Sequence, residues 1–257
     1  MCEIFGASSK KERHLNDFLK VLYSHSNNHP HGWGLAYMAG QKMFIEKESL
    51  QASKSEYLNC RLSQPIISKN ALAHIRYATI GNIDYHNCHP YSKKDNFGRR
   101  WTLIHNGTIF DCPLLNKYIK LQEGETDSER ILLYLVEKIN TLQSRFYKPL
   151  NGTEQFELID KIICDISKNN KLNLLIFDGE YMYVHTNYAK SLHYHESSEG
   201  IIFSTLPLTN EGWQAVPFTT LLAYKDGELK FTGTNHGNEY EDNEESLKFL
   251  YQIFSDL

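Results

Sequence analysis

Cysteine stands at position 2 of the chain, at the head of the segment MCEIFGAS. Removal of Met1, which is common when residue 2 is small, would leave Cys2 with both a thiol and a free α-amine. The α-amine has a reference pKa of about 7.7–8.0, so it can act as a general base near neutral pH. A terminal amine that activates a side-chain nucleophile is an established catalytic arrangement. The alternative is that Cys2 is a small buried residue of a strand, as free cysteines usually are.

Arginine ends a second segment of interest, the apolar run ALAHIR, and opens into a long polar loop. Arg76 at the end of a strand can hold a carboxylate through two parallel hydrogen bonds, a geometry that lysine does not offer. It would then anchor an acidic substrate. The alternative is that Arg76 pairs with a structural carboxylate of the protein itself.

A third segment, WTLIHNGTIF, places His105, Asn106 and Gly107 inside a β-rich run. Asn-Gly is typical of a tight hairpin turn, and this is the simplest interpretation. A β-bulge fits equally well, because β-rich residues continue on both sides. A bulge could aim the Asn106 amide and a backbone N–H at one point. Two such donors form an oxyanion hole, which stabilises acyl-transfer transition states by roughly 3–4 kcal/mol per donor.

The fourth segment is TDSE, which precedes the apolar run ILLYLVEKI. Thr126 and Glu129 have the spacing of a helix capping box. The cap does not require Asp127, although an acidic residue is favourable in a first helical turn. Asp127 is therefore a candidate for binding an ammonium group.

Twelve histidines raise the question of a metal site, especially His25, His29 and His31, and the pair His86 and His89. No HExxH motif and no paired Cys/His spacing supports one, so polar surface histidines are the better interpretation. The glycines of HGWG lack the frame of a phosphate-binding loop. We predict neither a metal nor a cofactor.

The composition is that of a globular protein: 41% apolar and 23% charged residues, with a formal net charge of −4. Without a basic excess, neither nucleic acid nor an anionic membrane is indicated as a partner. No apolar run is long enough to cross a bilayer, and the N-terminus becomes charged at SSKKER without a signal-peptide core. Five widely spaced cysteines indicate reduced thiols. We expect a cytoplasmic protein.

Around these segments the hydrophobic periodicity alternates between strands and helices. We predict helices over 14–26, 52–64, 112–122, 126–143, 153–169 and 245–257. Strands are predicted within the first ten residues and over 31–38, 42–49, 71–79, 99–110, 172–179, 181–187, 191–197, 200–206, 218–227 and 228–233. Strands, a helical block and strands again predict an α+β fold in one domain, 1–257, with two packed sheets and helices outside.

The order of Cys2, HGWG, HIRYAT, NCHP, HNG and TDSE resembles that of the class II glutamine amidotransferases. Members of this family are N-terminal-nucleophile hydrolases with a four-layer αββα sandwich of two mainly antiparallel sheets. The later segment GIIFSTLPLTNEGWQAVP is similar to one found in stand-alone members. The resemblance therefore implies this sandwich for most of the chain.

The resemblance also implies roles for individual residues. Cys2 would be the nucleophile and its α-amine the base. The Asn106 side chain and the Gly107 backbone N–H would form the oxyanion hole. Arg76 would bind the α-carboxylate of a γ-glutamyl substrate, and Asp127 its α-amino group.

Further motif positions lie near the implied site. Tyr77 and Thr79 are implied as substrate-binding residues, and His89 falls at a motif position with a less defined role. The chain departs from many synthase-linked members at Ile80, where those have histidine. Contacts with the substrate are expected to differ there.

These residues indicate an N-terminal-cysteine amidohydrolase that releases glutamate from glutamine or another γ-glutamyl compound through a γ-glutamyl thioester. With 257 residues, a separate acceptor domain is not expected, which favours a stand-alone amidase. Two alternatives stay open: a glutaminase subunit that delivers ammonia to a separate synthase, and a catalytically idle binding protein with the same fold. The small-molecule substrate is the expected partner, and a homodimer or a complex with a separate synthase is compatible with the sequence.

Overall fold

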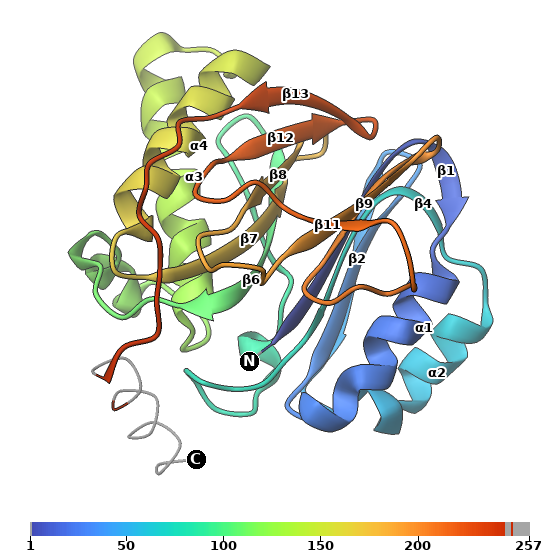
Figure 1. Ribbon diagram of the computed structural model, residues 1–257. Coiled ribbons are helices and arrows are strands. Elements are labelled where there is room, and N and C mark those ends of the chain that lie inside the picture. Colours follow the sequence, from blue (N-terminus) through green and yellow to red (C-terminus); the bar gives the residue numbers. More distant parts are fainter. Residues whose placement is uncertain (1, 245–247, 249–257) are drawn as a thin grey trace.

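Two antiparallel β-sheets lie face to face, with helices on both outer surfaces (Figure 1). The computed structural model describes residues 2–244 and 248. The predicted α+β class and four-layer αββα sandwich are confirmed. The helix predicted over 245–257 falls outside the described residues except at Lys248.

The first sheet has seven strands in the order β11-β9-β10-β1-β4-β2-β3. Its central strand β1 pairs with β10 on one side and β4 on the other, both antiparallel. The strands are β1 (Glu3–His14), β2 (Trp33–Ala39), β3 (Lys42–Glu48), β4 (Ile67–Ile75), β9 (His193–Ser197), β10 (Gly200–Ser204) and β11 (Trp213–Ala215).

The second sheet has six strands in the order β13-β12-β8-β7-β6-β5. Neighbouring strands are again antiparallel. The strands are β5 (Tyr91–Lys94), β6 (Arg100–Thr108), β7 (Lys171–Phe177), β8 (Met182–His185), β12 (Leu222–Lys225) and β13 (Glu228–Thr232).

Four α-helices form the outer layers. Helices α1 (Asn16–Ser24) and α2 (Glu56–Ser63) cover the first sheet, while α3 (Asp127–Phe146) and α4 (Gly152–Ser167) cover the second. Side-chain caps begin three of them: the side chains of Ser55, Thr126 and Asn151 each accept a hydrogen bond from a backbone N–H of the first turn. The short 3₁₀ helices are η1 (His25–Asn28), η2 (Ala52–Lys54), η3 (Tyr85–Asn87) and η4 (Pro113–Lys120).

Three hydrophobic clusters correspond to the three interfaces between the four layers. Alternation along β1 shows the division: Ile4 belongs to the cluster between the sheets and Phe5 to the cluster under the helices. The sheets approach closely at Gly6, where an added Cβ would lie 2.8 Å from a methyl carbon of Leu175. Because β1 is covered on both faces, its first seven residues are buried without the polar alternation of a surface strand.

Two local predictions were wrong. Strand β1 extends through the charged SSKKERH to His14, because β4 continues to pair with it at Arg13 and His14 after an irregularity that follows Ser8. The first helix consequently begins at Asn16. Strand β6 runs without a break through Gly107, in unshifted register with β7, so there is neither a hairpin turn nor a bulge.

Within the described part of the chain, no helix combines the length and apolar character that a bilayer-crossing segment needs.

The layers bury several histidines, and this predicts sensitivity to acid. Burial lowers the pKa of six histidines below the ordinary 6.5, that of His185 to about 3; the others are His31, His74, His89, His105 and His236. Below pH 6.5 the unfolded chain then binds more protons than the folded one, so the free energy of unfolding falls as the pH falls.

We expect urea unfolding to give a progressively smaller unfolding free energy between pH 7 and pH 5. Carboxylates with lowered pKa values contribute only below about pH 4.5, so the two effects separate in pH. An unfolding free energy that stayed constant from pH 7 to pH 5 would contradict the prediction.

Candidate active site

Cys2 precedes the central strand, and its sulfur contacts the backbone of Tyr77. The Tyr77 N–H donates to Sγ at 3.3 Å, and the thiol lies 3.4 Å from the Tyr77 carbonyl oxygen as a donor. Strand register explains the contact, because Glu3 of β1 is paired with Ile75 of β4. The residue is partly exposed, but burial of the sulfur raises the pKa of the Cys2 thiol. A base must therefore remove the proton before the sulfur can act as a nucleophile.

Two charged groups act on this thiol from nearby elements. The positive charge of Arg76 lowers the pKa of Cys2 and the negative charge of Asp127 raises it, although burial is the larger cause. The Cys2 thiol thus lies within electrostatic range of both Arg76 and Asp127.

Arg76 is buried, with 3% of its surface exposed, and its guanidinium holds the loop that follows β4. It donates to the carbonyl oxygens of Ile80, Gly81 and Asn82 at 3.1, 2.8 and 2.9 Å. These backbone partners of Arg76 are not evident from the sequence.

Glu125 fixes the same loop from the other side. It accepts from the Asn82 N–H at 2.8 Å and from the Asn87 amide at 3.1 Å. Arg76 and Glu125 therefore hold the same loop through hydrogen bonds. Nothing in the sequence indicated that Glu125 supports the site.

Asn106 and Gly107 lie side by side on β6, opposite Asn173 and Leu172 of β7. Asn106 is buried, its Oδ1 has no hydrogen-bond partner among the described residues, and its Nδ2 lies 3.5 Å from Thr205 Oγ1. Gly107 is required by space: an added Cβ would stand 2.0 Å from the Lys171 carbonyl oxygen.

Thr205 joins the amide of Asn106 to β1, the strand that follows Cys2. Its Oγ1 accepts from the Ile4 N–H at 3.0 Å, and its own N–H donates to the Ile4 carbonyl at 3.1 Å. Thr205 lies in the segment GIIFST that supported the family resemblance, but its type and position alone gave no sign of this bridge.

Asp127 is the first residue of α3 and is 4% exposed. Its Oδ2 accepts from the Ile109 N–H at 2.7 Å, and Oδ1 lies 3.3 Å from Ser128 Oγ. Ser128 in turn lies 3.0 Å from Nδ1 of His105. The carboxylate is thus tied to both ends of the Asn106-Gly107 segment, and the sequence analysis missed Ser128 and His105 as its supports.

The remaining predicted residues lie in or behind the segment after β4. Tyr77 contacts the thiol through its backbone, and its ring packs on His31 with 5.1 Å between ring centroids. Thr79 lies two residues farther on and is partly exposed. His89 is stacked on His74, with 4.1 Å between ring centroids.

The prediction of surface histidines was wrong at two positions. His89 is 4% exposed, and its ring nitrogens and those of His74 have no hydrogen-bond partner among the described residues. His29 is also buried, and its Nε2 lies 3.0 Å from Oε1 of Glu3. The other carboxylate oxygen of Glu3 lies 2.9 Å from Nδ1 of His25. Buried uncharged His74 and His89 can pack against each other where two imidazolium ions could not.

Within residues 2–244 and 248, no group of three or more His, Cys, Asp or Glu side chains is arranged to hold a metal ion. The described arrangement instead offers a protonated thiol, two amide-type donors, a guanidinium and a carboxylate. Such a set can support nucleophilic attack on a carbonyl group of a zwitterionic molecule.

Known proteins resemble this chain in sequence and in fold. The sequence profile of the glutamine amidotransferases class-II matches residues 1–197. An uncharacterised protein of Methanocaldococcus jannaschii is 28% identical over 261 residues, which cover 90% of this chain and 71% of that protein. A Haemophilus influenzae protein, provisionally named a glutamine amidotransferase, is 29% identical over 226 residues, which cover 78% of this chain and 75% of that protein.

Solved structures share the fold at lower identity. A Pseudomonas aeruginosa protein described as a predicted glutamine amidotransferase has a TM-score of 0.61 at 20% identity, covering 89% of this chain and 99% of that chain. Glutamine phosphoribosylpyrophosphate amidotransferase of B. subtilis has a TM-score of 0.67 at 18% identity, covering 91% of this chain and 49% of that chain.

The tight contact at Gly107 predicts a specific loss of stability. In Gly107→Ala the new methyl group meets the Lys171 carbonyl of a paired strand, which cannot turn away as a side chain can. We expect a loss of about 3 kcal/mol in unfolding free energy, the upper range for overpacking.

The matched control is Gly40→Ala, at a turn with φ of 60° and no atom within 4 Å of the new Cβ. Its cost is the left-handed backbone alone, about 1 kcal/mol. Denaturant unfolding of both variants checks the prediction. Equal losses of unfolding free energy would show that the close contact between β6 and β7 does not exclude a side chain at Gly107.

Proposed function

The chain belongs to the class II glutamine amidotransferases, and on that premise we propose that it is an N-terminal-cysteine amidohydrolase. It would cleave the γ-glutamyl amide bond of glutamine or of another γ-glutamyl compound and release glutamate. The observation that carries the proposal is the placement of the Cys2 thiol at the head of the central strand. There it contacts Tyr77 and lies within electrostatic range of Arg76 and Asp127.

The first chemical step uses the terminal residue twice. After loss of Met1, the α-amine of Cys2 takes the thiol proton, and the sulfur forms a bond to the γ-carbonyl carbon. The oxygen becomes an oxyanion that the Asn106 amide and the Gly107 N–H stabilise. Because burial raises the pKa of the thiol, the sulfur stays protonated until the amine acts.

The second half of the reaction restores the enzyme. The tetrahedral intermediate collapses, the C–N bond breaks, and the α-ammonium returns its proton to the departing amine. This leaves a γ-glutamyl thioester on Cys2. Water, deprotonated by the same α-amine, adds to the thioester carbonyl, and glutamate leaves as the thiol is regenerated.

Substrate recognition would place opposite charges on the two ends of the amino-acid head group. Arg76 would bind the α-carboxylate and Asp127 the α-ammonium group. Since the guanidinium donates to three loop carbonyls, a carboxylate would have to replace some of these bonds, with a shift of residues 80–82. Tyr77 and Thr79 belong to the same segment and would border the bound substrate.

Replacement of the thiol provides the decisive test. We expect purified wild-type protein to release glutamate from at least one member of a panel of glutamine, γ-glutamyl amides and γ-glutamyl peptides. Cys2→Ala should lose about 10³-fold or more of this activity, because the covalent step disappears.

Two measurements make the result interpretable. Intact mass establishes whether Met1 is absent and the α-amine therefore free. Cys60→Ser, which changes an exposed cysteine, should retain full activity. Undiminished release by Cys2→Ala, or no release from any substrate by mature wild type, would refute the proposal.

Thr205 should act as a positioning residue for the oxyanion hole. Thr205→Val removes the hydroxyl that joins Asn106 to Ile4, so the amide is less well fixed where the oxyanion forms. We expect kcat to fall about tenfold while KM changes little, because the interaction strengthens only in the transition state.

Thr205→Ser keeps the hydroxyl and should retain nearly wild-type kcat. A purely structural role would be seen instead as equal losses in both variants, or as a loss of unfolding free energy in Thr205→Val without a change in kcat.

A further inference from the structure

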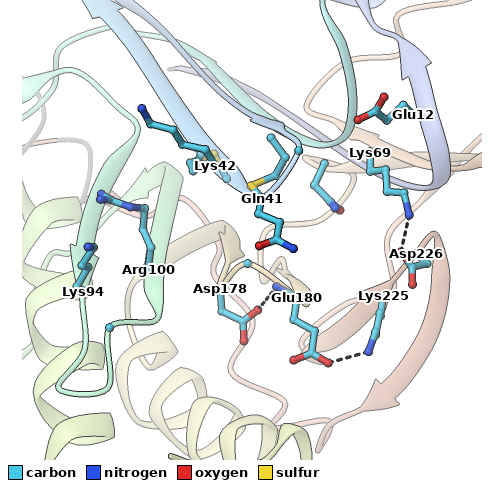
Figure 2. Close-up of a pocket in the computed structure, with 16 residues that line it drawn as sticks. Glu12, Gln41, Lys42, Lys69, Lys94, Arg100, Asp178, Glu180, Lys225 and Asp226 are labelled. Atoms are coloured by element: carbon cyan, nitrogen blue, oxygen red, sulfur yellow. Dashed lines mark hydrogen bonds and ion pairs between the residues drawn. The ribbon is translucent and has the colours of Figure 1, made fainter.

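A cleft of about 830 Å³ opens between the two sheets at the end of the sandwich opposite Cys2. Hairpin turns and strand ends of both sheets line it, including the β2–β3, β5–β6, β7–β8 and β12–β13 turns (Figure 2). Asn70, near the start of β4, lines the cleft, whereas Arg76 follows the end of this strand. At about 3.3 Å per residue the two sites are separated by about 20 Å.

Cations without carboxylate partners gather on one wall of this cleft. Lys94 of β5 and Arg100 of β6 are directly opposite each other in the antiparallel pair. Lys42 of the other sheet lies on the same side of the cleft in Figure 2. None of the three has an ion pair within the described part of the chain; Arg100 donates to Ser92 Oγ at 3.0 Å, and the Lys42 ammonium lies 5.0 Å from the Phe44 ring centroid.

The direct Lys94–Arg100 pairing is unfavourable for the protein alone. Like charges opposite each other on neighbouring strands destabilise a sheet, and neither side chain has an ion pair with a carboxylate of the described residues. A bound anion would remove this repulsion. The pairing is therefore the observation that distinguishes this wall from an ordinary charged surface.

The other charged side chains that line the cleft, apart from Glu12, are already paired. Lys225 pairs with Glu180 at 2.7 Å, Lys69 with Asp226 at 3.8 Å, and Asp178 with Arg99 at 2.9 Å. Glu12 is the lining carboxylate that has no ion pair among the described residues, and Figure 2 shows it on the far side from Lys94 and Arg100. The cleft therefore holds three cations without an ion pair, on one side, and one such carboxylate, on the other.

The remaining lining suits a molecule with an apolar part. Met38 and Met43 contribute flexible thioether side chains, which pack well against aromatic rings. The Gln41 amide lies in the middle of the view in Figure 2 and can both donate and accept hydrogen bonds.

Three turn glycines at the rim leave their backbone open. Gly40, Gly98 and Gly179 have φ of 60°, 85° and 96°, and no atom lies within 4 Å of an added Cβ at any of them. A ligand can therefore approach the main chain closely at these turns. The volume is also within the range of small-molecule sites, about 300–1,000 Å³.

We propose that this cleft is a second ligand site, which binds a small molecule carrying several phosphate charges and an aromatic portion, as a nucleoside triphosphate does. The Arg100 guanidinium would bind the phosphates in a bidentate manner, with Lys94 and Lys42 as additional charges. The aromatic portion would lie toward Met38 and Met43. This site is additional to the proposed amidohydrolase and uses none of its residues.

The test is calorimetric titration of the full chain with ATP, GTP and inorganic tripolyphosphate at low salt without divalent cations. We expect a nucleoside triphosphate to bind more tightly than tripolyphosphate, with affinity that falls as salt is added. Lys94→Gln/Arg100→Gln should weaken binding about tenfold or more, equivalent to about 1.4 kcal/mol or more. Without ligand, the same variant should melt at a higher temperature than wild type, because the like-charge pair is gone.

The matched control is Lys20→Gln/Lys161→Gln, which removes two exposed charges from the outer helices α1 and α4. It should bind like wild type. No binding of any probe, or equal weakening in both double variants, would overturn the proposal. Tripolyphosphate binding as tightly as ATP and GTP would overturn the aromatic part and leave a plain polyanion surface.

A glutamate-release assay distinguishes failure of the second ligand site from failure of the proposed amidohydrolase. The cleft variants should release glutamate at the wild-type rate in the absence of nucleotide, which also shows that they are folded. An inactive wild type that binds ATP would refute the amidohydrolase alone, and an active wild type that binds none of the probes would refute the second site alone.

Discussion

The pairing of β1 with β4 is the constraint on which the site depends. It places Glu3 opposite Ile75, so the residue before β1 meets the residues after β4. The sulfur of Cys2 and the backbone of Tyr77 come into contact for this reason. A slip of one residue would turn the Cys2 side chain to the helix-covered face, away from Arg76 and Asn106.

Polar groups at the same end of the sandwich are fixed by one another rather than by solvent. Thr205 joins β10, β1 and β6, while Ser128 and His105 join α3 to β6. Such buried networks are favourable only when most members find partners. Burial also lowers the pKa of His74 and His89, so their rings are neutral. Neutral rings can be enclosed in the protein where charged ones cannot.

The antiparallel sandwich separates its two ends chemically. Apolar residues between the sheets, such as Leu72, Ile104 and Leu175, fill the middle. One end holds Cys2 and its neighbours, and the hairpin turns form the cleft at the other. The same strands therefore carry a polar site at each end, with an apolar core between the two.

Much of the architecture could be read from the sequence. Hydrophobic periodicity located most strands and helices, and the ordered motifs identified the family and its αββα fold. Local patterns failed where long-range pairing overrides them: the charged end of β1 is extended because β4 pairs with it, and Asn106-Gly107 continues a strand because β7 lies alongside. Strand register and packing are properties of distant segments, which a short window of residues does not contain.

The candidate site divides in the same way. Residue types made Cys2, Arg76, Asn106, Gly107 and Asp127 candidates, and the order of the motifs that contain them, which resembles that of the family, implied their roles; those catalytic roles stay predictions. Only the tertiary structure decided that Arg76 holds residues 80–82, that Thr205 bridges Asn106 to β1, and that His74 and His89 are buried together. The sequence determined which chemical groups are present, whereas their partners depend on which distant strands lie side by side, and that is decided when the two sheets pack.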